Sequence, residues 1–244
     1  RTLSALGELE AAESHLRRAV ALHAAERGSG HPFTLTSRLH LANALGRLGR
    51  RTEAERLTRE VVEGRTAALG RDHLDTMIAV GNLAELLRQR DALDAAEPLA
   101  REVLAWRRAN LAPTDRDVLR ALSNLGLVLQ ARGEVDEAER LFREELELSR
   151  QAFPPDHPQL QLARNNLAFC LHGRGAHEEA AVLLGRSLES ARRALGEEHD
   201  QTLLAMSNLG AVLEDLERYD EAGRLIETSL AVRTRRHGPE HPSL

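Results

Sequence analysis

Histidine is the residue of chemical interest that returns most regularly in this sequence. The series consists of His31, His73, His157, His199 and His241, spaced by 42 or 84 residues, with Asp115 where one histidine is missing. Imidazole is a common metal ligand and proton carrier. With one histidine per 42-residue unit, however, neighbours would lie about 10 Å apart, the packing distance of helices, which is too far to share an ion. We therefore predict that these side chains mark the starts of helices.

The other side chains of catalytic type lack partners at a useful spacing. His172 and His177 are the closest other histidine pair, but they lie on either side of a predicted turn between two helices. Only carboxylates such as Glu178 and Glu179 are nearby. Cys170 falls on the apolar stripe of a predicted helix, which favours packing over nucleophilic catalysis. We therefore predict neither a metal site nor a catalytic residue.

Composition excludes several classes of function. The chain has 33 basic residues, all of them arginine, against 38 acidic residues, for a formal net charge of −5. Without lysine there is no Schiff-base or phosphate-loop lysine, and an acidic chain is poorly suited to phosphate backbones. The sequence holds one cysteine and no run of about 18 apolar residues. We predict a cytoplasmic, non-enzymatic protein that has no cofactor and binds neither nucleic acid nor membrane.

Other residue types return at the same interval of 42. Asn-Leu followed by Ala or Gly occurs at residues 82–84, 124–126, 166–168 and 208–210, and His40-Leu41-Ala42 is an imperfect earlier copy. An alanine series has the same period: Ala12, Ala54, Ala96, Ala138, Ala180 and Ala222. No insertion or deletion interrupts either series. A fixed period of this length indicates a repeat architecture.

Each 42-residue unit predicts two helices. Apolar or small residues at helical spacing, such as Ala79, Leu83 and Leu87, predict the first helix. The turn that follows carries Gly7, Gly49, Gly133 or Gly175, with Asp91 and Glu217 as the exceptions. The expected N-caps of the second helix are Thr52, Asp94, Asp136 and Asp220, and its expected C-terminal glycines are Gly28, Gly70, Gly196 and Gly238. A single helix pair cannot bury the apolar stripes of both of its helices. Stacked repeats can bury them against one another, so we expect the repeats to share a continuous core.

These patterns resemble the tetratricopeptide repeat (TPR) family, and within it the kinesin-light-chain-like branch of 42-residue units. The pattern is carried by His31-Pro32-Phe33-Thr34-Leu35 and by Gly133-Glu134-Val135-Asp136-Glu137-Ala138-Glu139. The resemblance covers essentially the whole chain. It implies a bacterial, all-α protein folded as an α-α superhelix, a right-handed TPR solenoid of five full helix pairs plus one partial N-terminal repeat.

The repeat boundaries follow from the period. We expect a single solenoid domain over residues 1–244, with a partial repeat at about 1–30, full repeats at 31–72, 73–114, 115–156, 157–198 and 199–240, and the start of a further repeat at 241–244. Neither end carries an evident polar cap. The chain is therefore expected to be part of a longer array, with self-association through its uncapped ends as a further expectation.

The asparagine series is the main candidate for function. In TPR proteins that clamp peptides, the asparagine before Leu-Gly or Leu-Ala faces the groove and bonds the ligand backbone or its terminal carboxylate. By resemblance this role falls on Asn82, Asn124, Asn166 and Asn208. An amide offers both a donor and an acceptor, which matches the N–H and C=O groups of an extended peptide. The alternative is that these amides tie adjacent repeats together, and the two roles can coexist.

Neighbours on the same helical stripe complete the predicted peptide-binding groove. They are Asn43, Glu85, Arg88 and Arg120 in its polar part and Leu127, Leu162, Phe169 and Leu204 in its apolar middle. This mixture predicts an extended peptide with a hydrophobic anchor. A carboxylate clamp is disfavoured, because its lysines are absent and only two arginines of the stripe could replace them.

Two functions from different classes follow. The first is a scaffold that binds a peptide or protein segment in its concave groove. The second is a sensor or oligomerisation segment of a larger bacterial signalling protein, such as an ATP-driven signalling ATPase or a Ser/Thr kinase, because arrays of this branch resemble the C-terminal part of such proteins.

Overall fold

The computed structural model describes the chain from residue 2 to residue 237, with side chains from residue 7 to residue 236. Over that range it contains eleven helices and no strand, which confirms the predicted all-α class. The chain forms two compact units, one ending at Ala112 and the other beginning at Pro113. Expected features at Gly238 and His241 lie outside the described residues.

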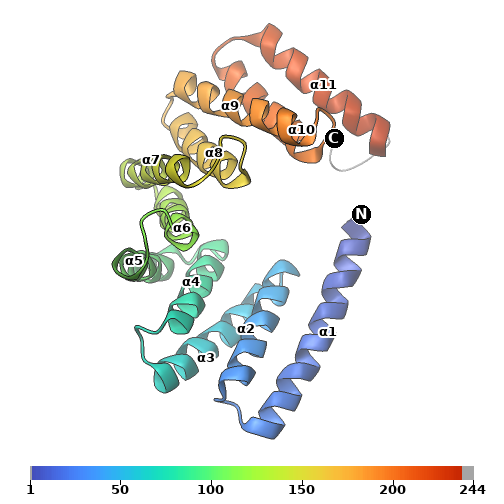
Figure 1. The fold of residues 1–244 in the computed structure, drawn as a ribbon. Coiled ribbons are helices and arrows are strands. Elements are labelled where there is room, and N and C mark those ends of the chain that lie inside the picture. Colours follow the sequence, from blue (N-terminus) through green and yellow to red (C-terminus); the bar gives the residue numbers. More distant parts are fainter. Residues whose placement is uncertain (1, 238–244) are drawn as a thin grey trace. The chain divides into compact units, whose positions relative to one another are not determined.

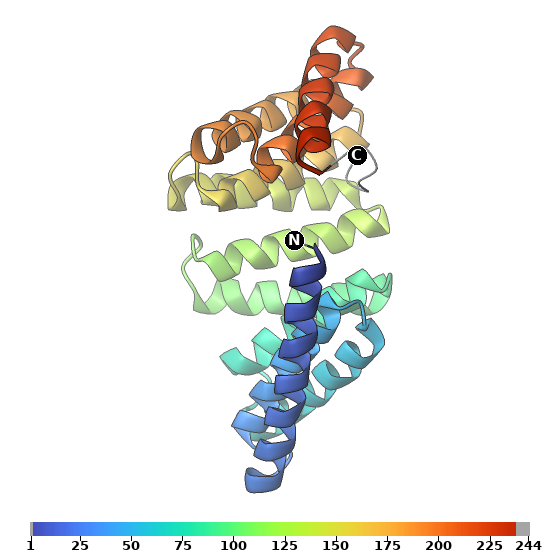
Figure 2. The same cartoon turned by 90° about the vertical axis from the view of Figure 1, so that its right-hand side faces the viewer.

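The first unit contains five helices and the second contains six (Figure 1). Those of the first unit are α1 (Thr2–Arg27), α2 (Pro32–Arg47), α3 (Arg51–Leu69), α4 (Leu74–Gln89) and α5 (Leu93–Asn110). Those of the second unit are α6 (Arg116–Arg132), α7 (Val135–Ala152), α8 (Pro158–Gly173), α9 (His177–Leu195), α10 (Asp200–Asp215) and α11 (Tyr219–His237). Within each unit every helix packs against the next in sequence, as the turned view shows (Figure 2). From α2 onward, each even-numbered helix is the first of a repeat and the following odd-numbered helix is the second.

The recurring histidines start helices, as predicted. The Nδ1 atoms of His31, His73, His157 and His199 each accept a hydrogen bond from the backbone N–H two residues later, at 3.1–3.3 Å. Asp115 does the same with its carboxylate at 2.8 Å, which explains why it can replace histidine in the series. These side chains satisfy an N–H group that has no partner inside the helix.

The turn between the two helices of a repeat requires a left-handed residue. Gly49, Gly133 and Gly175 have φ between 78° and 83°, and the two exceptions, Asp91 and Glu217, also have positive φ, at 61° and 58°. In all five turns the residue after the left-handed one donates its backbone N–H to the carbonyl oxygen five residues earlier, at 2.9 Å. In the first of these turns Arg50 donates to Leu45. This bond reverses the chain and satisfies a free carbonyl at the end of the first helix.

Two local predictions were wrong. The second helices follow Arg50, Ala92, Glu134 and Ala176, none of which makes a side-chain cap, so Thr52, Asp94 and Asp136 lie inside the first turn. The backbone bonds of the preceding turn already direct the chain into the helix, and first-turn carboxylates still favour the helix dipole. The turn expected at Gly7 is also absent, because α1 runs without a break from Thr2 to Arg27.

Small residues allow the two helices of a repeat to approach closely. The recurring alanines Ala54, Ala96, Ala138, Ala180 and Ala222 are at most 1% exposed. The tightest case is Gly126 of α6, where an added Cβ would lie only 2.6 Å from the ring of the fully buried Phe142 of α7. Gly210 has the same relation to Ile226 of α11, at 2.8 Å. In contrast, a Cβ at Gly185 of α9 would meet no atom within 4 Å.

Two glycine-to-alanine substitutions should therefore have opposite effects on stability. We expect Gly126→Ala to lower the free energy of unfolding by about 1–3 kcal/mol, because the new methyl group overpacks against Phe142. Gly185→Ala should raise it by about 0.5–1 kcal/mol, because alanine is the better helix former and the space is open. Urea unfolding of the two variants beside the wild type measures both changes, and an equal effect of the two substitutions would contradict the packing.

Candidate functional site

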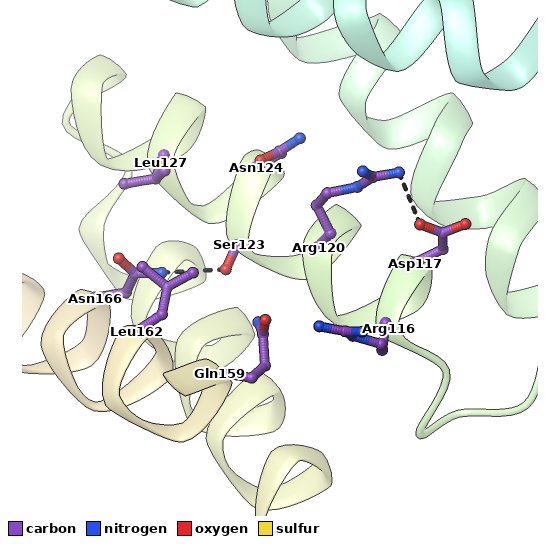
Figure 3. A pocket seen from close by; sticks show the side chains of 9 residues that line it. All are labelled: Arg116, Asp117, Arg120, Ser123, Asn124, Leu127, Gln159, Leu162 and Asn166. Carbon is purple, nitrogen blue, oxygen red and sulfur yellow. Dashed lines mark hydrogen bonds and ion pairs between the residues drawn. The ribbon is translucent and has the colours of Figure 1, made fainter. Parts of the chain in front are cut away.

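A pocket of about 460 Å³ opens between the first helices of two successive repeats in the second unit (Figure 3). Its lining from α6 is Arg116, Asp117, Arg120, Ser123, Asn124 and Leu127, and its lining from α8 is Gln159, Leu162 and Asn166. On each helix these residues recur every three or four positions, which places them on one face.

Five of the residues predicted from the sequence meet in this pocket. They are Arg120, Asn124, Leu127, Leu162 and Asn166. The prediction missed Arg116, Asp117, Ser123 and Gln159, although the first two precede Arg120 by one helical turn and the same helical spacing could have found them. The structure thus groups two amides, two leucines and an arginine, and adds polar neighbours at one end.

The polar groups of this α6–α8 pocket are partly engaged with one another. The Asn166 Nδ2 group donates to Ser123 Oγ at 3.1 Å, which joins α8 to α6. At the rim, Arg120 donates to Asp117 at 2.7 Å (Figure 3). The Asn166 contact shows that tying adjacent repeats together is one role of the asparagine series, and it leaves the amide oxygen of the same side chain as an acceptor.

A buried carboxylic acid lies behind the polar wall of the pocket. Glu145 of α7 is 0% exposed, and neither of its carboxylate oxygens has a hydrogen bond of ordinary geometry. Burial raises the pKa of Glu145 to about 7, and the neighbouring Ser123, Asn166 and Gln159 groups lower it only in part. A group that changes charge near neutral pH therefore lies directly behind the residues that line the pocket.

Glu145 departs from the pattern of the repeat. The equivalent residues 42 and 84 positions away are Val61, Val103, Ser187 and Ser229, all buried. A valine or serine suffices for packing at this position, so the repeat fold itself does not require a carboxyl group. Comparison of this position with its equivalents in the other repeats is the signal that could have singled out Glu145 from the sequence.

The first unit has a related pocket of about 470 Å³ between α2 and α4. It is lined by the predicted residues Asn43, Asn82 and Glu85, where Asn82 donates to Asn43 at 3.3 Å. Glu85 accepts two hydrogen bonds from Arg88 and one from Gln89, all at 2.7–2.8 Å. The charge of Glu85 is therefore already compensated within the unit.

Within the second unit, three predicted residues lie outside the α6–α8 pocket. Phe169 of α8 and Leu204 of α10 are 52% and 54% exposed, so they present apolar surface on the first helices of the second unit. Asn208 of α10 is half-buried. The prediction that Cys170 packs in the core is confirmed, since it is fully buried and burial raises the pKa of its thiol.

A third pocket, of about 410 Å³ and not predicted from the sequence, is formed mainly by the second helices α9 and α11. Its lining includes Val182, Leu188 and Leu225 together with Arg192 and Arg224. It lies on second helices, whereas the two pockets above lie on first helices. Among the described helices, none combines the length and apolarity needed to cross a membrane.

Known proteins share this architecture, and two family models identify the family to which the chain belongs. Two family models, both described as tetratricopeptide repeat, match the chain, one at residues 1–33, 34–75, 76–116 and 202–243 and the other at 117–193 and 159–222. The class of protein is thus a helical-repeat solenoid. The chain belongs to the tetratricopeptide repeat family, whose repeats generally mediate protein–protein interaction and are typically not enzymes.

Solved structures of similar fold include kinesin-light-chain-like repeats. The nearly identical TPR-like repeats of a kinesin light chain from Podosopora anserina give a TM-score of 0.75 at 23% identity, over 83% of this chain and 95% of that one. BtubC (BKLC) from P. vanneervenii gives 0.78 at 20% identity, over 96% and 94%. The apo form of RapI gives 0.70 at 13% identity, over 83% and 71%. At these identities the likeness is one of fold, and no curated protein matches the sequence.

The buried carboxyl group predicts a pH-dependent stability. The pKa of Glu145 is about 7 in the folded chain against 4.5 for the free group, so the folded state holds the proton more tightly. Its contribution to stability is therefore complete below about pH 4.5 and is lost as the pH rises to about 7. We expect the free energy of unfolding to fall over this interval, relative to Glu145→Gln, on the order of 3 kcal/mol.

Urea unfolding of the wild type and of Glu145→Gln between pH 5 and pH 8 measures this difference. The exposed Glu147 on the same helix supplies the control, Glu147→Gln. Parallel stability curves for the wild type and Glu145→Gln would show that the buried carboxyl does not titrate as described.

Proposed function

We propose that this chain is a protein-interaction module that binds an extended peptide segment across α6 and α8, with one apolar side chain of the peptide in the pocket between them. The observation that carries the proposal is the meeting of two asparagine amides with two leucines in one pocket built from successive repeats. Binding in a groove of first helices is also what the TPR resemblance implies.

The amides suit the backbone of a peptide. Asn124 and Asn166 come from equivalent positions of successive repeats and both line the pocket. Each side chain can donate to a carbonyl and accept from an N–H group, so together they can pair with an extended strand without reading its sequence. Asn166 keeps this capacity through its oxygen, because its Nδ2 group bonds Ser123.

The leucines supply the anchor site. Leu162 is 48% exposed and Leu127 is half-buried beside it in the same pocket. Covering the exposed part of such a side chain with an apolar group of the peptide removes both surfaces from water, which favours binding. The exposed Phe169 and Leu204 offer further apolar contacts on α8 and α10.

The charges favour a peptide of mixed polarity over a free carboxylate. Arg120 is paired with Asp117 at 2.7 Å, so it is not available as a simple anion clamp. The pocket between α2 and α4 is a weaker candidate for the main site, because Glu85 is already compensated by Arg88 and Gln89. The alternative of a sensor or oligomerisation segment has no comparable observation in its favour.

The proposal predicts which substitutions weaken peptide binding. A linear peptide selected from a displayed random library against the whole chain provides the probe, and isothermal titration gives its Kd. We expect Asn124→Ala with Asn166→Ala to weaken binding about 10- to 100-fold, since each lost hydrogen bond is worth about 0.5–1.5 kcal/mol. Leu162→Ala should weaken binding by about tenfold through lost apolar contact.

Matched controls separate binding from folding. Asn110→Ala, in α5, removes an amide that bonds only its own helix at Trp106 and should leave Kd unchanged. Asn124→Ala alone is tested as well, because Asn166 also ties α8 to α6, and thermal unfolding of each variant confirms that it is folded. An affinity unchanged in the double variant would refute the role of the two amides.

A further inference from the structure

Two histidines and an aspartate meet at the junction of the last two repeats of the second unit. His172 is in the last turn of α8, His177 is the first residue of α9, and Asp215 is the last residue of α10. One ligand atom from each of the three lies within 4.8 Å of the other two. The two histidines are close together in the sequence, but the aspartate comes from the next repeat, 38 or more residues away.

The distances within the cluster are those of groups that could share one ion. His172 Nε2 lies 2.5 Å from Asp215 Oδ2, and His177 Nδ1 lies 3.9 Å from the same oxygen. The two imidazole rings approach edge to face, with centroids 5.2 Å apart. Donor atoms around a tetrahedral ion at about 2.1 Å are roughly 3.4 Å from one another, so small side-chain rotations bring all three into range.

One ring nitrogen of the cluster lacks a hydrogen bond within the described part of the chain. His177 Nδ1 is buried from solvent and has no hydrogen-bond partner among the described residues. A buried ring nitrogen without a partner loses the hydrogen bond that it would make in water, which costs free energy. A metal ion bound between this nitrogen, His172 and Asp215 would remove that cost.

The cluster is not a structural feature of the repeat. The equivalent three positions one repeat earlier in the same unit are Gln130, Val135 and Gly173, which provide no imidazole and no carboxylate. The helix pairs on both sides are built in the same way without these ligands. The residue types at this junction therefore depart from what packing demands, as Glu145 does behind the α6–α8 pocket.

We propose that His172, His177 and Asp215 form a binding site for a divalent transition-metal ion of the Zn²⁺ type that joins the repeat of α8 and α9 to that of α10 and α11. Two imidazoles and one carboxylate are a donor set that Zn²⁺ accepts in tetrahedral geometry, with water in the fourth position. Mg²⁺ prefers oxygen donors and should not bind here. Because the ligands come from α8, α9 and α10, which pack in sequence (Figure 1), bound metal stabilises the junction.

Thermal unfolding of the whole chain with ZnCl₂ or MgCl₂ tests the proposal. We expect Zn²⁺ at saturating concentration to raise the melting temperature of the wild type by about 5 °C and Mg²⁺ to leave it unchanged. His177→Ala and Asp215→Asn should lose most of the shift. His40→Ala, at an exposed histidine on α2, is the matched control and should keep it.

Titration with Co²⁺ gives a second measurement that does not depend on stability. We expect one equivalent of Co²⁺ to produce a visible absorption band in the wild type and in His40→Ala, and no band in His177→Ala or Asp215→Asn. Absence of stoichiometric binding in the wild type would overturn the proposal. So would a Zn²⁺ shift and a Co²⁺ band that persist in both ligand variants, since the ion would then bind other histidines.

Discussion

The close approach of the two helices within each repeat is the constraint on which the rest of this structure depends. It requires a small residue on the first helix, such as Ala84 or Gly126, and it buries the recurring alanine of the second helix completely. In the repeat whose second helix carries the large ring of Phe142, the first helix carries Gly126. In the repeat whose second helix carries Ala100 at the equivalent position, the first helix carries Ala84. With one face of α6 and α8 fixed in this way, their remaining faces carry Asn124, Leu127, Leu162 and Asn166, which line the proposed binding pocket.

The sequence predicts most of the local structure, because the features that determine it are short-range. Histidine and aspartate caps act on an N–H group two residues away, and the turn residues at Asp91 and Glu217 were recognised by their place in the period. The starts of the second helices were predicted wrongly for a related reason. Backbone bonds such as that from Arg50 to Leu45 replace the expected side-chain caps, and backbone bonds leave no sign in the residue types.

The candidate site could be predicted only in part. One face of α6 or α8 follows from helical spacing, so Asn124, Leu127 and Leu162 were found. Contacts between repeats follow the packing of helices and not the period of the sequence, and Ser123 pairs with Asn166 across 43 residues, not 42. His172 meets Asp215 across the same separation, which a search for ligands near one another in sequence does not reveal.

Two departures from the repeat lie in the second compact unit. Glu145 stands where the equivalent positions carry valine or serine, and His172, His177 and Asp215 stand where the preceding repeat carries Gln130, Val135 and Gly173. In a repeat protein the helices of every repeat pack in the same way, so a polar residue that only one repeat contains points to a local function. The two departures are independent, because one lies behind the α6–α8 pocket and the other lies at the junction of α8, α9 and α10.

The central claim is that a peptide binds across α6 and α8 on the first helices. The most direct test replaces the apolar anchor of a selected peptide with a photoreactive leucine analogue, followed by mass spectrometry of the cross-linked chain. The account predicts adducts within residues 116–127 and 159–166, which contain the whole lining of that pocket. Adducts confined to α9 and α11, whose side chains line the third pocket, would contradict it.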